Sequence, residues 1–148
     1  MSTHATVEIW ENAAAPKSEE RPVVLYQHSD GGMLINDVIE AMKRHTRWND
    51  AAYLSRMIFC QMLCGDLNPL TGTTGYGILT DNISDAKIEI VIDCSRQEII
   101  VKEVNRNNEI YTFEEFAGLG KKYIDTRVIT DRRMRSERRD SSTLRRRN

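Results

Sequence analysis

Two consecutive helical segments lie between groups of short extended segments, and this order constrains the fold more than any other feature of the chain. Met33–His45 carries its apolar residues at helical spacing along one stripe, and Ala51–Cys64 is apolar around most of its circumference. The segments on either side alternate apolar and polar residues with a period of two, which is typical of β-strands. Consecutive helices between runs of strands favour an α+β fold over repeated β-α-β units.

The element order follows from these periodicities. The expected strands are Thr6–Trp10, Pro22–His28, Tyr76–Thr80, Ala86–Cys94 and Glu98–Val104, with a turn cluster before Glu109–Tyr111. We predict the order ββ-αα-βββ-α, an antiparallel sheet with the two central helices packed on one side. The first two strands are expected to pair with each other, and the strands after the helices to form a meander.

Local signals at the ends of the helices refine this prediction. Asn49 or Asp50 can cap the second helix, which we expect to be central and buried. Thr112 and Glu115 have capping-box spacing, which predicts a short third helix. A bare strand edge near Val7 or Tyr111 could pair with a second copy, so a homodimer is the expected oligomer.

Charge and apolar content divide the 148-residue chain into a domain and a tail. Residues 1–126 hold 12 Lys and Arg against 19 Asp and Glu, a net charge of −7, whereas residues 127–148 hold nine Arg against three acids, a net charge of +6. Residues 131–148 contain two apolar residues, Met134 and Leu144, too few to form a core. We predict one α+β domain over residues 1–129 and a disordered, arginine-rich tail over residues 130–148.

The tail is a candidate nucleic-acid-binding segment, because closely spaced arginines bind phosphates without sequence preference. The candidate residues are Arg132, Arg133, Arg135, Arg138, Arg139, Arg145, Arg146 and Arg147. No aromatic residue lies between them to stack on bases. The alternative interpretations are a solvated tail, self-association, and contact with the acidic domain.

A short polar segment after the second strand is the best candidate ligand site. His28 and Asp30, two residues apart, point to one face of an extended segment, with Tyr26 before them and Gly31 after them. A carboxylate that orients an imidazole is suited to acid–base chemistry or to anion binding. The alternative is a structural turn held by the Asp30 side chain.

The glycine- and threonine-rich loop at residues 71–77 could contribute to the same site. Thr73, Thr74 and Tyr76 supply hydroxyl groups, and exposed backbone amides can bind phosphate. The loop lacks the Lys-Ser/Thr ending of a P-loop, so it is also interpreted as a connector. No serine or cysteine has a recognisable nucleophile motif around it.

Three cysteines, an odd number, argue against a disulfide framework and favour a reducing compartment, so we expect a cytoplasmic protein, in the host cytoplasm if viral. Cys60 and Cys64 lie four residues apart and could bind a metal with His28 and Cys94. One C-x3-C pair is an incomplete zinc pattern, so we interpret all three as buried core thiols and expect no metal or cofactor.

The motif Tyr26-x-His28-x-Asp30-Gly31, followed by Trp48-Asn49-Asp50 and by Gly75-Tyr76-Gly77-Ile78, resembles a group of short uncharacterised proteins of phages and prokaryotes. The resemblance covers roughly residues 22–94. It implies a small accessory gene product of viral or prokaryotic type, and it implies no activity.

These observations predict a non-enzymatic accessory protein that captures a partner protein or a small anionic ligand such as a nucleotide. The alternative is a nucleic-acid-binding protein that uses the arginine-rich tail. A hydrolase or nuclease that depends on His28 and Asp30 is the third hypothesis, and no membrane association is expected.

Overall fold

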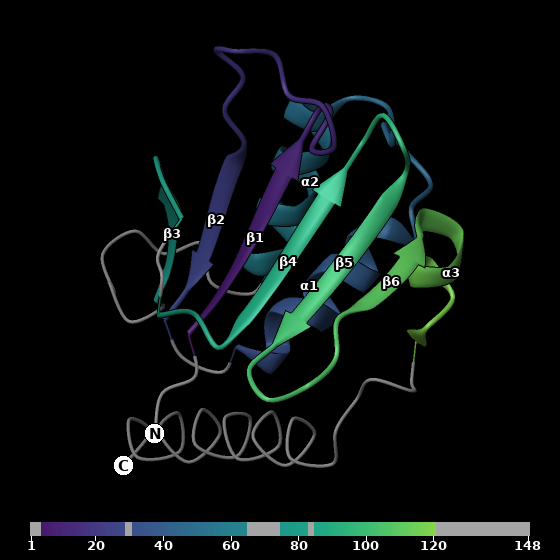
Figure 1. Cartoon of the computed structure of the whole chain (residues 1–148). Coiled ribbons are helices and arrows are strands. Elements are labelled where there is room, and N and C mark those ends of the chain that lie inside the picture. Colours follow the sequence, from purple (N-terminus) through teal and green to yellow (C-terminus); the bar gives the residue numbers. More distant parts are fainter. Residues whose placement is uncertain (1–3, 29–30, 65–74, 83–84, 121–148) are drawn as a thin grey trace, which may run out of the picture.

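A computed structural model describes residues 4–28, 31–64, 75–82 and 85–120 of the chain (Figure 1). It contains a six-stranded sheet and three helices among these residues. In chain order they are β1 (Ala5–Trp10), β2 (Val23–Gln27), α1 (Gly32–Met42), α2 (Ala51–Met62), β3 (Tyr76–Leu79), β4 (Ile88–Asp93), β5 (Glu98–Glu103), β6 (Glu109–Thr112) and α3 (Phe113–Ala117). The predicted α+β class is confirmed, with β6 as a fourth strand after the central helices. Residues 130–148 lie outside the described residues, so the disorder predicted for the tail stays a prediction.

The sheet is mixed, so the prediction of a purely antiparallel sheet is wrong. Its strand order is β3-β2-β1-β4-β5-β6. The predicted antiparallel pairing of β1 with β2 is confirmed, and β4, β5 and β6 also form antiparallel pairs. At the centre, however, β1 and β4 run parallel, and β3 pairs with β2 rather than with β4. Val7 therefore lies in an inner strand, and β3 and β6 are the edges of the sheet.

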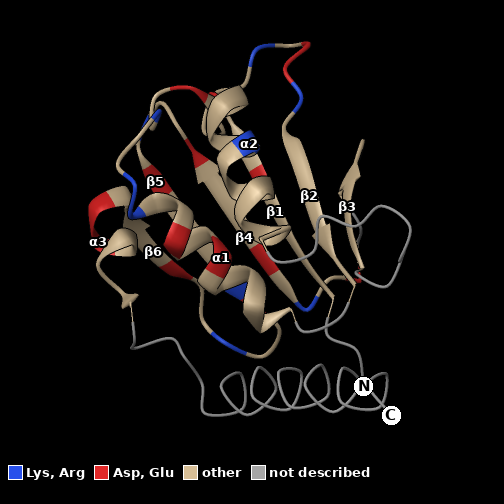
Figure 2. Cartoon of the chain, turned by 180° about the vertical axis from the view of Figure 1, so that it is seen from behind, with Lys and Arg blue, Asp and Glu red and all other residues tan. Residues whose placement is uncertain are grey.

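The two faces of the sheet have different surroundings. Helices α1 and α2 lie over one face, behind the sheet in Figure 1 and in front of it in Figure 2. Val7 and its cross-strand neighbours Leu25 and Ile90 point to that face and are at most 1% exposed. Side chains one residue away in each strand, such as Glu8, point to the opposite face, which carries no helix among the described residues. Asn82 Nδ2 donates a 2.6 Å hydrogen bond to Glu8 Oε1, so the segment after β3 contacts this helix-free face.

Helix α2 is amphipathic, and the prediction of a helix buried all round is wrong. Asp50 caps it as predicted, because its carboxylate accepts a 3.1 Å hydrogen bond from the Tyr53 amide. Leu54 and Ile58 are fully buried against the core, whereas Tyr53 is 46% exposed. A helix sequence that is apolar around most of its circumference does not indicate how many sides of the helix the rest of the domain covers.

The short helix α3 closes the sheet at β6. Thr112 Oγ1 accepts a 3.1 Å hydrogen bond from the Glu115 amide, which confirms the predicted cap. Phe113 and Phe116 are at most 1% exposed, and the Trp48 ring meets Phe113 edge-on at 5.5 Å. These aromatic contacts join α3 to the connection between α1 and α2.

Candidate functional site

A cluster of two imidazoles, a phenol and a carboxylate lies at the end of the sheet where β1 begins and β2 ends. It consists of His4, Tyr26, His28 and Asp85, and we call it the histidine cluster. The register pairs Ala5 with Gln27 and Thr6 with Tyr26, so His4 and His28 are the next residues to meet across the two strands. The period of two places His4, Tyr26 and His28 on the helix-free face.

The rings of the histidine cluster are in direct contact. The imidazole centroids of His4 and His28 are 4.5 Å apart, with 32° between the ring planes. The Tyr26 ring meets His4 edge-on at a centroid distance of 5.9 Å. The Tyr26 hydroxyl lies 2.9 Å from Nδ1 of His28, and Nδ1 of His4 lies 3.5 Å from the Asp85 carboxylate. The Tyr26 hydroxyl and the Asp85 carboxylate thus each contact a different imidazole.

Backbone hydrogen bonds hold the cluster in place. The His28 amide donates a 2.7 Å hydrogen bond to the Gly75 carbonyl, at the start of β3. On the other side, the His4 carbonyl accepts hydrogen bonds from the amides of Lys87 and Ile88. His28 and Gly75 are so close that a Cβ atom on residue 75 would lie 2.4 Å from Cβ of His28. Glycine is required at this position because any side chain would displace His28.

The contact with Tyr26 determines what His28 can offer to a ligand. When the tyrosine hydroxyl donates to Nδ1, a neutral imidazole must carry its proton on Nε2. A protonated imidazole also carries a proton on Nε2, so with the hydroxyl as donor in the neutral state this nitrogen is a hydrogen-bond donor in both charge states. His28 is exposed, and no hydrogen bond to its Nε2 is present among the described residues. With its proton on Nε2, His28 therefore presents a hydrogen-bond donor to solvent, which is the chemistry that binds an anionic oxygen.

The structure brings together some of the predicted ligand-site residues. Tyr26 and His28 are adjacent, as predicted, whereas Gly31 begins α1 as its N-cap. Tyr76 pairs with Gln27 in the sheet and packs partly against the core on the helix side, so it points away from the face that carries His28. Asp30, Thr73 and Thr74 lie outside the described residues.

His4 and Asp85 are members of the cluster that the sequence patterns did not single out. One signal could have found His4: extending the expected antiparallel pairing of the first two strands by one residue places it opposite His28. Asp85 lies in the connection between β3 and β4, and its position depends on the parallel pairing of β1 with β4. That pairing joins segments far apart in the sequence and leaves no local pattern.

The cysteines differ from the sequence interpretation. Cys94 is buried, as predicted, and burial raises the pKa of its thiol to about 12. Cys60 and Cys64, however, are exposed on α2 and beyond its end, so their interpretation as core thiols is wrong. Within the described part of the chain, no three His, Cys, Asp or Glu side chains are grouped to hold a metal ion. The four-ligand set of His28, Cys60, Cys64 and Cys94 is therefore not assembled within one chain.

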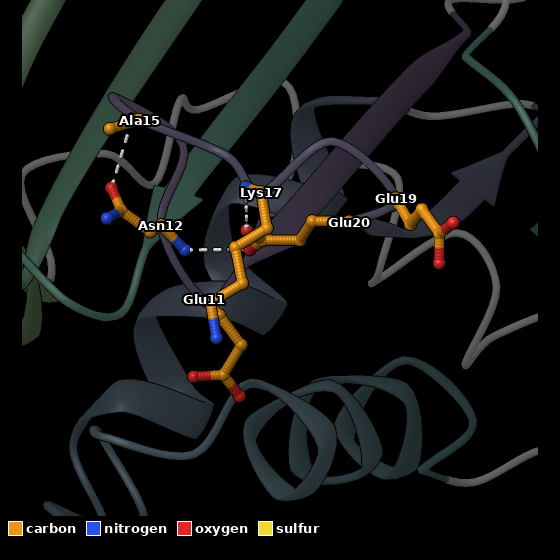
Figure 3. A pocket seen from close by; sticks show the side chains of 6 residues that line it. All are labelled: Glu11, Asn12, Ala15, Lys17, Glu19 and Glu20. Carbon is orange, nitrogen blue, oxygen red and sulfur yellow. Dashed lines mark hydrogen bonds between the residues drawn. The ribbon is translucent and has the colours of Figure 1, made fainter.

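A concave region lies away from the histidine cluster, in the connection between β1 and β2 (Figure 3). It has a volume of about 540 Å³ and is lined by Glu11, Asn12, Ala15, Lys17, Glu19 and Glu20. The Glu20 carboxylate accepts hydrogen bonds from the amides of Asn12 and Lys17, at 2.9 Å and 3.0 Å, and these bonds lower the pKa of Glu20. The carboxylate thus organises its own loop, and we assign this region a structural role.

The predicted nucleic-acid-binding arginines, in residues 130–148, lie outside the described residues. No described helix has the length and apolar character needed to cross a bilayer. Comparisons with protein-family models, curated proteins and solved structures gave no match. Function is therefore inferred from side-chain geometry.

Proposed function

We propose that this protein is a small, non-enzymatic accessory protein that captures an anionic ligand, a phosphate-bearing molecule such as a nucleotide, at the histidine cluster. The observation that carries the proposal is the pair of contacting imidazoles, one of which is exposed and contacts the Tyr26 hydroxyl through Nδ1. A phosphate oxygen accepts the hydrogen from His28 Nε2. The ring of His4 lies beside it and adds positive charge when it is protonated.

Of the two histidines in the cluster, His28 is the better placed to bind an anion. Asp85 lies 3.5 Å from His4, whereas no carboxylate of the described residues forms an ion pair with His28. The planar base of a nucleotide can stack on the exposed imidazole in the offset arrangement that aromatic rings prefer. The phosphate of the same nucleotide can accept a hydrogen bond from Nε2. A protein partner that presents a phosphate or carboxylate group would use the same donor.

The first test is a melting experiment with inorganic phosphate and with mono-, di- and cyclic nucleotides. A ligand at 100 times its Kd stabilises the folded state by about 2.7 kcal/mol, so a saturable rise in Tm of several degrees is expected for at least one of them. His28→Gln and Tyr26→Phe should each reduce the rise, because the first removes the imidazole and the second removes the hydroxyl that orients it.

His45→Asn is the matched control. His45 is also an exposed histidine in ring contact, at 4.5 Å from Trp48, but it lies after α1 and away from the cluster. This variant should keep the full rise in Tm. An unchanged Tm with every ligand, or an equal rise in wild type and His28→Gln, would contradict the proposal. Recovery of the nucleotide intact after incubation separates capture from hydrolysis.

Nucleic-acid binding by the tail is the second candidate function, supported by the net charge of +6 in residues 127–148. Truncation after Ile129 should abolish binding to single-stranded DNA and RNA. Binding by the full chain should weaken steeply with salt, because phosphate contacts release counterions. Binding that persists after truncation would exclude the tail as the contact.

A further inference from the structure

One side of α2 presents a stripe of apolar and sulfur-containing side chains that are exposed or partly exposed in the described part of the chain. The stripe consists of Tyr53, Met57, Cys60 and Cys64, spaced four, three and four residues apart. Tyr53, Cys60 and Cys64 are exposed and Met57 is partly exposed. The opposite side of the helix is buried in the core. We call this set of four residues the α2 stripe. Its spacing is the one with which two helices pack against each other.

The two thiols of the α2 stripe are placed to bind the same ion. Residues four apart on a helix have Cβ atoms about 5–6 Å apart. Two sulfurs on one tetrahedral zinc ion lie about 3.8 Å apart, given a Zn–S bond of about 2.3 Å. Cys64 follows the last turn of α2 and its amide donates to the Gln61 carbonyl at 3.2 Å, which keeps it close to the helical path. Each side chain therefore needs only to lean toward the other.

A single chain supplies half of such a site. Structural zinc sites take four ligands, whereas the described residues offer no third His, Cys, Asp or Glu beside the two thiols. Cys94, the remaining cysteine, is buried at the end of β4. A second copy that presents its own α2 stripe would supply the missing two thiolates and cover the stripe in the same contact.

The charges around the stripe favour this assembly when a metal is present. Helix α2 contains no Asp or Glu. Arg56 is exposed on one side of it, and on the other side Arg44 donates to Gln61 at 3.2 Å and Arg47 lies over the Tyr53 ring at 4.5 Å. Two such surfaces repel each other, but a Zn²⁺ ion with four thiolates carries a net charge of −2, which offsets the arginines of both copies.

We propose that two copies of the chain join through the α2 stripe around one shared Zn²⁺ ion, which is bound by Cys60 and Cys64 of each copy. Four Zn–S bonds form, four thiol protons pass to the solvent, and no electrons are transferred. Zinc then controls self-association, because the metal site is incomplete in a single copy.

The test uses the full chain, purified without metal and kept reduced by a non-thiol reductant. Zn²⁺ is added in steps, and native mass spectrometry reads the number of chains and ions. We expect a shift from monomer to dimer that is complete at one ion per two chains. Co²⁺ in place of Zn²⁺ should give the absorption of a tetrahedral thiolate site. Cys60→Ser and Cys64→Ser should each lose the dimer and the absorption, and as exposed substitutions they should keep the wild-type Tm.

Three further variants distinguish the proposed zinc site from other causes of zinc-dependent dimerisation. Cys94→Ala should retain the zinc-dependent dimer, and so should His28→Gln, which excludes a metal held by the histidine cluster. Met57→Glu keeps both thiols but places a charge at the centre of the stripe, so it should raise the zinc concentration needed for dimerisation. A monomer at saturating zinc, one ion per chain, or a dimer unaffected by the Cys60 and Cys64 substitutions would overturn the proposal.

Discussion

The close approach of Gly75 to His28 predicts that Gly75→Ala damages both the fold and the candidate site. The added Cβ would lie 2.4 Å from Cβ of His28 and 3.3 Å from its backbone nitrogen. Carbon atoms in contact need about 3.5–4.0 Å, so the two segments must separate by about 1 Å or more. No rotamer relieves this clash, because Cβ of His28 is bonded directly to the backbone. The 2.7 Å hydrogen bond from the His28 amide to the Gly75 carbonyl lengthens as a result.

We expect Gly75→Ala to lower the free energy of unfolding by about 1–3 kcal/mol, the usual cost of overpacking. Urea denaturation followed by tryptophan fluorescence measures the change, and an unchanged m-value would show that the unfolded state is unaffected. The same variant should weaken ligand binding at the histidine cluster, because His28 moves away from Tyr26.

Gly77→Ala is the matched control, since it lies two residues further along the same edge of the sheet and a Cβ there meets no atom within 4 Å. This variant should be neutral or should gain up to about 1 kcal/mol from the stiffer unfolded chain. Equal stabilities for the two alanine variants would refute the reasoning, because the argument depends on the contact with His28.

Three other predictions concern the thiols, the connection between β1 and β2, and the core. At pH 8, iodoacetamide should alkylate Cys60 and Cys64 in the folded protein and leave Cys94 unmodified, because burial raises the pKa of the Cys94 thiol to about 12; mass spectrometry of peptides reads the result. Glu20→Gln should lower Tm at pH 7, and the difference from wild type should disappear as the pH falls through the lowered pKa of Glu20 in the folded state, because only the ionised carboxylate is favoured by the two amide bonds. Ile58→Ala should cost about 2–5 kcal/mol in urea denaturation, because Ile58 is fully buried between α2 and the sheet; a loss below about 1 kcal/mol would contradict its place in the core.

The secondary structure was predictable because its signals are local. The helix caps depend on residues three positions apart, and both Asp50 and Thr112 accept the expected amide hydrogen bonds. The strand alternation at residues 88–93 likewise depends on neighbours in the sequence. Sequence periodicity therefore identifies the elements within a few residues of their ends, apart from β6, which it indicates only as a short segment after a turn cluster.

The arrangement of the strands was not predictable in the same way. Pairing of consecutive strands is the simplest expectation, and it holds for β1 with β2 and for β4 with β5. Strand β4 pairs with β1 along the side that β2 does not occupy, and no local sequence pattern indicates which strand takes that side. The exposure of Cys60 was missed for a related reason: an apolar helix in a small domain can cover the core and still leave one side to solvent.

The sequence predicted the part of the candidate site that lies on a single strand. The spacing of Tyr26 and His28 places both side chains on one face, as the sequence indicated. His4 enters from the neighbouring strand and Asp85 from the connection after β3, so their contribution depends on tertiary structure.

The parallel pairing at the centre of the sheet also affects when the domain can fold. Strand β1 is synthesised before its parallel partner β4, and residues 11–87 separate the two strands in the chain. A ribosome-bound chain must therefore hold one side of this central strand unpaired until β4 has been translated, and such a side can pair with other chains. Contacts between distant segments also slow folding, because the intervening loop must be closed first. Co-translational folding of this protein should thus occur late and in one step, after β4 has left the ribosome.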